Sequence, residues 1–288
     1  MALNAVCPTP VQPMDRLGVA LGLAPGRLWV KRDDLTGLGG GGNKVRKLEH
    51  LCADAVAQGC DVLVTGGGRQ SNHVRMTAAA ANLLGLDCTI VLGSDPVDTA
   101  TGNVLLDHLL GPTIVWVGPL AYYDLEAAIV AEAERLRAAG RSPYAIPLGG
   151  ASTVGQLGYA RAALELREQR PGATLIVTAD GTGGTHAGLV AGWGDHRAVL
   201  GVDVGTRPDL DDVVPREAAE AATLAGLPTP TGSVQIDHGR FGDGYGAPTE
   251  SCREALDLCA RLEGLLLDPV YSGKGMAGLI AAVRERRV

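Results

Sequence analysis

Aromatic residues are scarce in this sequence: they make up 3% of its 288 residues, with a single Phe. The core must therefore be aliphatic, built from Ala, Val, Leu and Ile. No apolar run approaches the roughly 20 residues that a membrane-spanning helix needs, and the N-terminus lacks a signal-peptide pattern. These absences predict a cytoplasmic protein with no membrane partner.

Positive charge and metal-binding patterns are also missing. The net charge of −7 and the lack of a basic stripe with interleaved aromatics argue against a nucleic-acid partner. The six Cys are scattered, without the spacing of a zinc site or a CxxC motif. We therefore expect reduced thiols in a cytosolic protein and no metal ion.

Lysine is the rarest cation: it occurs at positions 31, 44, 47 and 274 only, among 25 Lys and Arg residues. Arg stays charged at neutral pH, whereas Lys can become a neutral amine and form a Schiff base. All four lie in Gly-rich or strand-end segments. We interpret this placement as a chemical signal, with chance clustering as the alternative.

Short apolar runs alternate with helical patterns along the chain, which predicts an α/β fold with open parallel sheets covered on both faces. The predicted strands are Leu28–Arg32, Asp61–Thr65, Cys88–Leu92, Thr113–Val117, Tyr144–Leu148, Thr174–Ala179, Val199–Val204 and Leu265–Val270. The predicted helices are Val45–Ala57, Asn72–Leu84, Asp124–Ala139, Val154–Glu168, His186–Trp193, Asp212–Ala225, Glu250–Leu262 and Lys274–Arg284.

A break near Gly149–Gly150 predicts two domains. Residues 50–150 would form a small domain, and residues 1–49 plus 151–288 a large one that binds a cofactor. Ligands in such folds lie beyond the carboxyl ends of the strands, in the crevice, and the Gly clusters occupy those places.

One Gly-rich turn has the properties of a phosphate site. Asp180-Gly-Thr-Gly-Gly-Thr185 follows a predicted strand and opens a predicted helix, so backbone N–H groups and the helix dipole converge there. The turn matches neither GxGxxG nor the P-loop, which favours a lone phosphate ester over a dinucleotide or a nucleoside triphosphate. An ordinary tight turn is the alternative reading.

Two further segments place polar side chains at predicted helix starts. Ser71 is a natural N-cap after Gly66–Gly68, and free N–H groups there suit a substrate carboxylate, with Arg69 adding a cation. A lone His such as His73 is more often structural than catalytic. Gly39–Gly42 followed by Asn43 and Lys44 brings an amine to the first turn of a helix.

These motifs occur in order along nearly the whole chain. The stretches are KRDDLTGLGGGGNKVRKLE (31–49), GRQSNHVRMTAAAANLLGL (68–86), TGNVLLDHLLG (101–111), IPLGGASTVGQLGYARAALEL (146–166), DGTGGTHAGLVAG (180–192), GDGYGAPT (242–249) and EGLLLDPVYSGKGMAGLI (263–280). In them the sequence resembles the D-cysteine desulfhydrase and ACC (aminocyclopropane-carboxylate) deaminase family. This family belongs to the fold-type II (tryptophan synthase β-like) enzymes that depend on pyridoxal 5'-phosphate (PLP).

The resemblance implies two α/β domains with PLP in the crevice between them, and a role for each matching residue. Lys44 resembles the Schiff-base lysine, and Ser71, Tyr245 and Tyr271 resemble the other catalytic groups. The cofactor would also contact Asn43, Lys47, Asn72, Gly181, Thr182, Gly183, Gly184, Thr185 and Ser272. Substrate would contact Ser71, Asn72, His73 and Arg69. Related chains are commonly homodimers.

Ser272 bears on the reaction. It matches the residue that meets the pyridine nitrogen, where ACC deaminases carry a glutamate. A serine hydroxyl stays neutral, so the ring should be a weaker electron sink, sufficient to expel a good β-leaving group. The expected function is β-elimination from a small β-substituted amino acid, such as D-cysteine or a cysteate-like compound, giving pyruvate and ammonia. Lys44 would remove the Cα proton.

Several alternatives stay open. The chain resembles ACC deaminases as well, and a β-replacement synthase or a catalytically silent PLP-binding protein would share the same motifs. Arg69 stands where the family usually has an apolar residue, and it either pairs with an anionic β-substituent or points to solvent. Members of the family continue with a strand and a His-Thr-Gly-Gly turn, which this sequence lacks after Val288.

Overall fold

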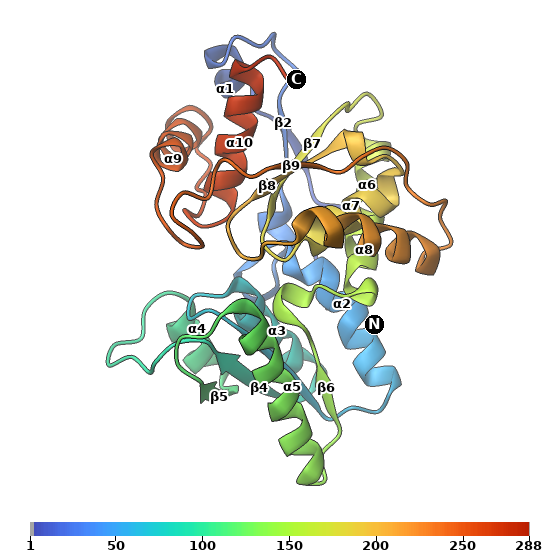
Figure 1. Ribbon diagram of the computed structural model, residues 1–288, viewed down its shortest axis with the longest axis vertical. Coiled ribbons are helices and arrows are strands. Elements are labelled where there is room, and N and C mark those ends of the chain that lie inside the picture. The colour runs from blue at the N-terminus through green and yellow to red at the C-terminus, as the bar shows by residue number, and fades with distance from the viewer. Residues whose placement is uncertain (1–2, 288) are drawn as a thin grey trace. The chain divides into compact units, whose positions relative to one another are not determined.

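The computed structural model describes residues 3–287, which fold as two compact units (Figure 1). The first unit comprises Met1–Cys7 and Asp33–Gly158, and the second comprises Pro8–Arg32 and Tyr159–Val288, as far as each is described. Each unit has its own parallel sheet and its own aliphatic core. Within the described range, no helix is both long and apolar enough to cross a membrane.

The first unit is built on a four-stranded parallel sheet of order β5-β4-β3-β6. Its strands are β3 (Val62–Gly67), β4 (Asp87–Leu92), β5 (Thr113–Trp116) and β6 (Pro143–Ala145). Its helices are α2 (Lys44–Ala57), α3 (Asn72–Leu84), α4 (Asn103–Leu110) and α5 (Tyr122–Ala138). Helix α6 (Thr153–Gln169) begins here and continues in the second unit.

Both faces of this sheet are covered, because successive side chains of a strand point to opposite sides. Val62 and Val64 of β3 pack in one cluster with Ile129 of α5. Leu63 belongs instead to the core that α2 and α3 fill. Helix α5 therefore covers one face and α2 and α3 the other (Figure 1), the arrangement that a parallel sheet requires.

The second unit has a three-stranded parallel sheet and a short antiparallel pair. The parallel strands, in the order β7-β8-β9, are β7 (Ile176–Asp180), β8 (Val199–Asp203) and β9 (Gln235–Asp237). The antiparallel pair is β1 (Val11–Pro13) and β2 (Trp29–Lys31). The helices are α1 (Asp15–Ala20), α7 (Gly184–Trp193), α8 (Leu210–Leu224), α9 (Glu250–Glu263) and α10 (Ser272–Arg284).

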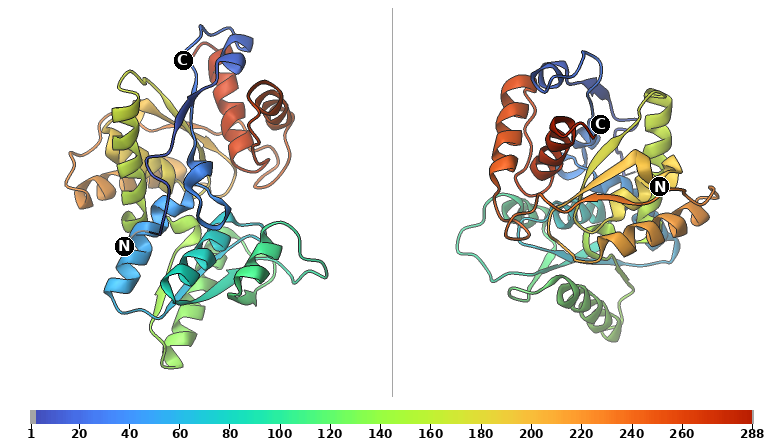
Figure 2. Two further views of the ribbon diagram at one scale, coloured as in Figure 1. Left: turned by 180° about the vertical axis from the view of Figure 1, so that it is seen from behind. Right: turned by 45° about the horizontal axis from the view of Figure 1, so that its top comes forward.

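Helices also cover both faces of this second sheet. On one face, α7 and α8 share an apolar cluster with Val199 of β8. On the other, α10 lies so close to β8 that a Cβ at Gly278 would come within 2.4 Å of Val202. Helix α9 packs beside α10, and both views in Figure 2 show the two helices next to each other.

The structure confirms the predicted α/β class with parallel sheets, and helix α3 has the predicted bounds. The predicted strand Leu265–Val270 is wrong, because this segment is a loop. The Asp268 carboxylate accepts the N–H groups of Val270, Tyr271 and Ser272 at 2.7 to 2.9 Å, so a side chain takes the place of a neighbouring strand. Strands β1 and β9 and helices α1 and α4 were not predicted.

The compact units divide the chain at other points than the domains expected from the sequence. Residues 33–49, expected with the large domain, pack with the first unit, and so do residues 151–158. The reason is visible at Gly158, where a Cβ would lie 2.0 Å from the carbonyl oxygen of Arg46. This backbone contact ties the start of α6 to α2. The expected division into functional domains stays a prediction.

The core of the first unit contains an unpaired carboxyl group. Asp107 of α4 is 1% exposed, and neither of its oxygens has a hydrogen-bond partner within residues 3–287. Burial raises the pKa of Asp107 to about 7, and the nearby Arg75 guanidinium opposes this rise only in part. The group is therefore a buried acid that titrates near neutrality.

Ionisation of Asp107 predicts how the stability of the protein depends on pH. The unfolded carboxyl ionises near pH 4, whereas the folded one keeps its proton to about pH 7. The free energy of unfolding should therefore fall between these values, by at most about 4 kcal/mol, and level off above them. We expect Asp107→Asn to flatten this profile in chemical denaturation from pH 4 to 8.

The matched control is Asp98→Asn, at an exposed aspartate of the same unit. This variant should keep the slope of the unchanged protein. If the two substitutions gave the same pH profile, the assignment of the slope to Asp107 would be wrong.

Candidate active site

Lys44 is the first residue of α2, and a tightly packed glycine loop leads into it. A Cβ at Gly41 would lie 2.0 Å from the carbonyl oxygen of Asp34, and its φ of 80° also favours glycine. The Thr36 hydroxyl, which is fully buried, accepts the Gly42 N–H at 2.9 Å. The loop is thus fixed on both sides, and it delivers the partly exposed Lys44 to the head of the helix.

Lys47 lies one turn further along α2 and is fully buried. Its ammonium donates to the carbonyl oxygen of Gly149 at 3.3 Å. Asn43 occupies the N-cap position of α2 with a helical backbone and makes no capping hydrogen bond through its side chain. The contact of both residues with a cofactor phosphate stays a prediction.

The predicted Ser71-Asn72 turn lies at the carboxyl end of β3. Ser71 caps α3, and its Oγ accepts the N–H of Val74 at 3.3 Å. The Asn72 Oδ1 accepts from Arg75 Nη1 at 3.0 Å and from Asn103 Nδ2 at 2.9 Å. The side chain of Asn72 is therefore fixed by two donors, one from its own helix and one from α4.

Arg75 joins this turn to the glycine loop. Its guanidinium donates to Asn103 Oδ1 at 2.7 Å and to the carbonyl oxygen of Gly41 at 3.1 Å, in addition to Asn72. The residue is 9% exposed, so few of these bonds compete with water. The sequence analysis missed Arg75 and Asn103. A lone arginine in the Ala-rich helix α3, three residues after Asn72, was the signal that could have found this contact.

His73 points into the core of the first unit. Its Nε2 lies 3.0 Å from Thr65 Oγ1, and the same hydroxyl donates to the carbonyl oxygen of Ile146 at 2.9 Å. A hydroxyl has one proton, so Thr65 accepts from His73, and Nε2 carries the ring proton. Burial, with smaller effects of Lys44 and Lys47, holds the pKa of His73 well below its usual value. His73 is therefore neutral.

Arg69 lies on the exposed turn before Ser71. Contact of Arg69 and of His73 with a substrate stays a prediction. The position of His73 favours the structural reading that the sequence analysis kept open, since its ring is 2% exposed.

In the second unit, the predicted phosphate turn connects β7 to α7. Gly183 has a left-handed backbone (φ 82°) and precedes Gly184, the first residue of α7. A Cβ at Gly181 would lie 3.1 Å from the Tyr271 ring and 3.4 Å from Thr206 Oγ1. Only a glycine leaves this surface of the turn open.

Features of this turn fit a phosphate ester. The first N–H groups of a helix lack partners within the helix and attract anions. The Thr206 hydroxyl next to Gly181 is buried without a hydrogen-bond partner among the described residues. It is therefore a donor that a phosphate oxygen would satisfy.

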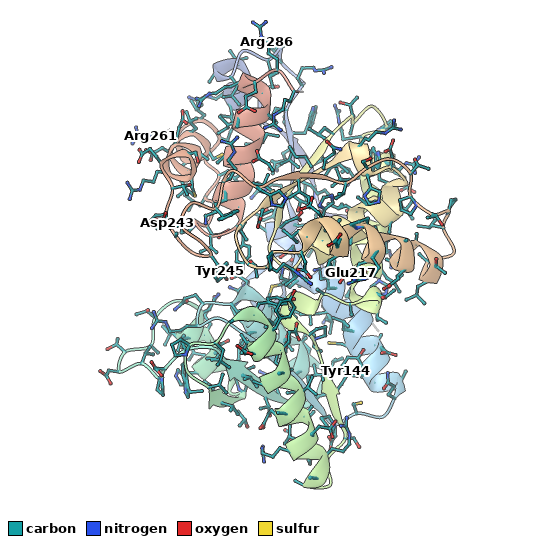
Figure 3. The ribbon with its side chains drawn as sticks, viewed as in Figure 1. Tyr144, Glu217, Asp243, Tyr245, Arg261 and Arg286 are labelled. Carbon is teal, nitrogen blue, oxygen red and sulfur yellow. The ribbon has the colours of Figure 1, made fainter. Side chains whose placement is uncertain are left out.

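Two predicted tyrosines meet in the second unit. Tyr245, on the loop between β9 and α9 (Figure 3), and Tyr271, just before α10, place their hydroxyl oxygens 2.6 Å apart. Burial raises the pKa of Tyr245 and raises that of Tyr271 well above its usual value. Both phenols are therefore protonated near neutral pH. One of the two phenol protons lies in the hydrogen bond between Tyr245 and Tyr271. The proton of the other phenol can therefore be donated to a further acceptor.

Ser272, the first residue of α10, is hydrogen-bonded to the carboxylate of Asp268. Its hydroxyl donates to Asp268 Oδ2 at 2.5 Å and accepts the N–H of Asp268 at 2.8 Å. The single proton of this hydroxyl is thus directed away from any ligand. The sequence analysis did not single out Asp268. This residue follows three consecutive leucines and lies three positions before Tyr271.

The fold and these residues fit one class of protein: α/β enzymes that use a lysine, a glycine turn at a helix start and protonated tyrosine hydroxyls. Among the described residues, no group of three His, Cys, Asp or Glu side chains is arranged to hold a metal ion. A lysine amine suits an aldehyde and the turn suits a phosphate, and PLP carries both groups.

Comparison with known proteins identifies the family. A family model described as pyridoxal-phosphate dependent enzyme matches residues 2–288. The chain belongs to this family of PLP-dependent enzymes. It is 41% identical over 295 aligned positions to D-cysteine desulfhydrases of Salmonella paratyphi B and Salmonella newport. The alignment covers 97% of this chain and 87% of each relative.

Solved structures agree with this assignment. A crystal structure of an ACC deaminase homologue has a TM-score of 0.90 and 36% identity, covering 98% of this chain and 86% of that one. Maize serine racemase (TM-score 0.64, 18% identity) covers 97% of this chain and 82% of its own. Threonine deaminase isoform 2 from Solanum lycopersicum (TM-score 0.70, 15% identity) covers 99% and 77%. The last two show the shared fold alone.

The Arg75 network makes a testable prediction. In Arg75→Met, the oxygens of Gly41, Asn72 and Asn103 lose a buried charged donor, so we expect the protein to lose roughly 3 kcal/mol of stability. Arg75→Lys should recover only part of this loss, because an ammonium on a shorter stem cannot reach three acceptors at once. Urea unfolding measures both. The control Arg137→Met, at an exposed arginine of α5, should change little.

Proposed function

We propose that this protein is a PLP-dependent lyase that eliminates the β-substituent of a small amino acid, D-cysteine or a cysteate-like compound. The products would be pyruvate, ammonia and the leaving group. The observation that carries the proposal is the 41% identity to D-cysteine desulfhydrases over 97% of the chain. Lys44 at the head of α2 and the open turn before α7 provide the groups that this chemistry needs.

We assign the cofactor and substrate contacts as follows. Lys44 would hold the cofactor at its aldehyde, and the Gly181–Thr185 turn, with Asn43 and Lys47, would hold its phosphate. Asn72 and Ser272 would lie against its ring. The substrate carboxylate binds at the start of α3, next to Ser71 and Asn72. When bound, PLP supplies the electron sink that stabilises negative charge at the substrate Cα.

The side chains divide the proton transfers between them. Lys44, as a free and neutral amine, would be the base that removes the Cα proton of the substrate. Ser71 accepts the N–H of Val74 and so keeps its own proton for an incoming oxygen. Tyr245 and Tyr271 share one proton internally and hold the second for the leaving group. The released enamine then hydrolyses to pyruvate and ammonia.

The position of Ser272 supports elimination over opening of a cyclopropane ring. Its hydroxyl is neutral and its proton goes to Asp268, so no group at this residue donates to a ring nitrogen. Asp268 does place a negative charge one hydrogen bond away. That charge is shared with three backbone N–H groups, which weakens its effect on the hydroxyl. Expulsion of a good β-leaving group needs less electron withdrawal than ring opening.

Two assays separate the three alternatives. A β-replacement synthase would form little pyruvate, because a nucleophile has to add to the enamine and the product is then an amino acid, and a silent PLP-binding protein would form none. Pyruvate formed from D-cysteine alone would exclude both. An ACC deaminase would act on the cyclopropane substrate, so a lack of turnover of that substrate would exclude it.

We also propose that the enzyme acts in the cytoplasm as a homodimer. All six cysteines are free, and four of them are buried, which fits a reducing compartment.

The identity of the cofactor lysine is directly testable. Lys44→Ala should lose the visible absorbance of the lysine-bound cofactor and at least about a thousandfold in kcat, because the base is removed. Lys44→Arg should behave in the same way, since a guanidinium neither forms a Schiff base nor loses its proton. The matched control is Lys31→Arg, because Lys31 is held by Glu165, Gln169 and the carbonyl oxygen of Thr9. If the absorbance survived in Lys44→Ala, the assignment would be overturned.

A comparison of substrates with different leaving groups tests whether Arg69 binds an anionic β-substituent. If its guanidinium pairs with an anionic β-substituent, Arg69→Ala should reduce kcat/KM for L-cysteate about tenfold and leave 3-chloroalanine nearly unchanged. Turnover of D-cysteine, L-cysteate and 3-chloroalanine should be compared in Arg69→Ala and in the exposed control Arg137→Ala. An unchanged ratio between the substrates would mean that Arg69 points to solvent.

A further inference from the structure

A buried aspartate–histidine pair lies directly beneath the Gly181–Thr185 turn. Asp180 is the last residue of β7, and His186 is the third residue of α7, so the two bracket the turn. His186 Nδ1 and Asp180 Oδ2 are 2.7 Å apart, and neither side chain has any exposed surface. The hydrogen bond therefore closes the turn from its inner side and links the end of the strand to the start of the helix.

The neighbouring strand leaves room for this pair. At Gly201 of β8, an added Cβ would lie 1.9 Å from Asp180 Oδ2 and 2.5 Å from His186 Nδ1. Gly201 has an ordinary backbone conformation, so the pair and not the backbone excludes a side chain at this position. Glycine at position 201 thus leaves space in the core for this polar contact, where a larger side chain would collide with it.

The two side chains also satisfy each other. Asp180 Oδ1 and His186 Nε2 have no hydrogen-bond partner in the described part of the chain, so each residue depends on the other. A buried polar side chain without a partner is costly, so the contact between Asp180 Oδ2 and His186 Nδ1 holds both in place. The neighbouring titratable groups include Asp203, which is in register with Asp180 on β8, and His196, whose pKa is lowered by burial and by His186.

We propose that Asp180 and His186 are positioning residues for the cofactor phosphate: their hydrogen bond joins the two ends of the Gly181–Thr185 turn and so fixes its backbone. This inference rests on the proposed function, since it takes the phosphate to be that of PLP. Both side chains lack exposed surface and face Gly201 of β8, so we expect neither of them to touch the phosphate.

The test compares two substitutions of Asp180 in the holoenzyme. Asp180→Ala removes the acceptor for His186 Nδ1–H, so we expect the dissociation constant for PLP to rise about tenfold or more. The 31P resonance of the bound cofactor should broaden and move toward that of free PLP. Asp180→Asn keeps an acceptor oxygen, and it should stay within about threefold of the unchanged protein with its 31P signal in place.

The matched control is His238→Gln, at a second aspartate–histidine pair on the same sheet. His238 Nδ1 lies 2.9 Å from Asp203 of β8, which is in register with Asp180, but this pair brackets no glycine turn. It should leave both readouts unchanged. If Asp180→Ala does not fold, as judged by circular dichroism, Asp180→Ser replaces it, since serine is also too short to reach Nδ1.

The outcomes separate the inference from the proposed function. If the unchanged protein bound no PLP, the proposed function would fail, and the inference with it. If it bound PLP but Asp180→Ala bound it equally well with the same 31P signal, only the positioning role would be overturned. Equal losses in Asp180→Ala and Asp180→Asn would also overturn that role, because the amide preserves the hydrogen bond.

Discussion

The candidate lysine site of the first unit depends on one buried cation. Arg75 donates to the backbone of the glycine loop at Gly41, to Asn72 at the head of α3 and to Asn103 at the head of α4. Three segments that are distant in sequence are thereby fixed by a single rigid guanidinium. A planar group with five donors suits this role, because its donors cannot rotate independently. The segments that carry Lys44 and Ser71 are therefore linked through one side chain, in addition to the contacts that hold each segment by itself.

Buried charge is handled differently in three places. Both terminal nitrogens of Arg75 donate to neutral oxygens, and burial lowers its pKa without removing its charge. Asp180 is hydrogen-bonded to His186, whereas Asp107 lacks a hydrogen-bond partner among the described residues and keeps its proton until about pH 7. The difference follows from desolvation: a carboxyl can avoid its cost by staying protonated, but a guanidinium cannot. The acid without a partner is therefore the one that titrates near neutrality.

Much of this organisation could be predicted from the sequence, and the failures have physical causes. Helix α3 was predicted residue for residue, because Ser71 caps it and Gly85 ends it in a left-handed conformation. The segment 265–270 was misread as a strand, because an apolar run carries no sign that the Asp268 carboxylate will bind its backbone. Tertiary partners such as Arg75 with Gly41 are not encoded in local spacing, so the glycine loop was recognised but the cation that holds it was not.

The hydroxyl protons show what chemistry these side chains support. Thr65 gives its proton to Ile146 and Ser272 gives its proton to Asp268, so neither hydroxyl is available to a substrate. Among the predicted catalytic hydroxyls, protons remain on Ser71 and on one member of the Tyr245–Tyr271 pair. Elimination needs a base at Cα and, for a poor leaving group, one acid at the β-position. In the proposed reaction, Lys44 would be that base and the tyrosine pair would hold the acid. The raised pKa of Tyr271 keeps the phenol protonated near neutral pH, so its proton would still be present when the leaving group departs.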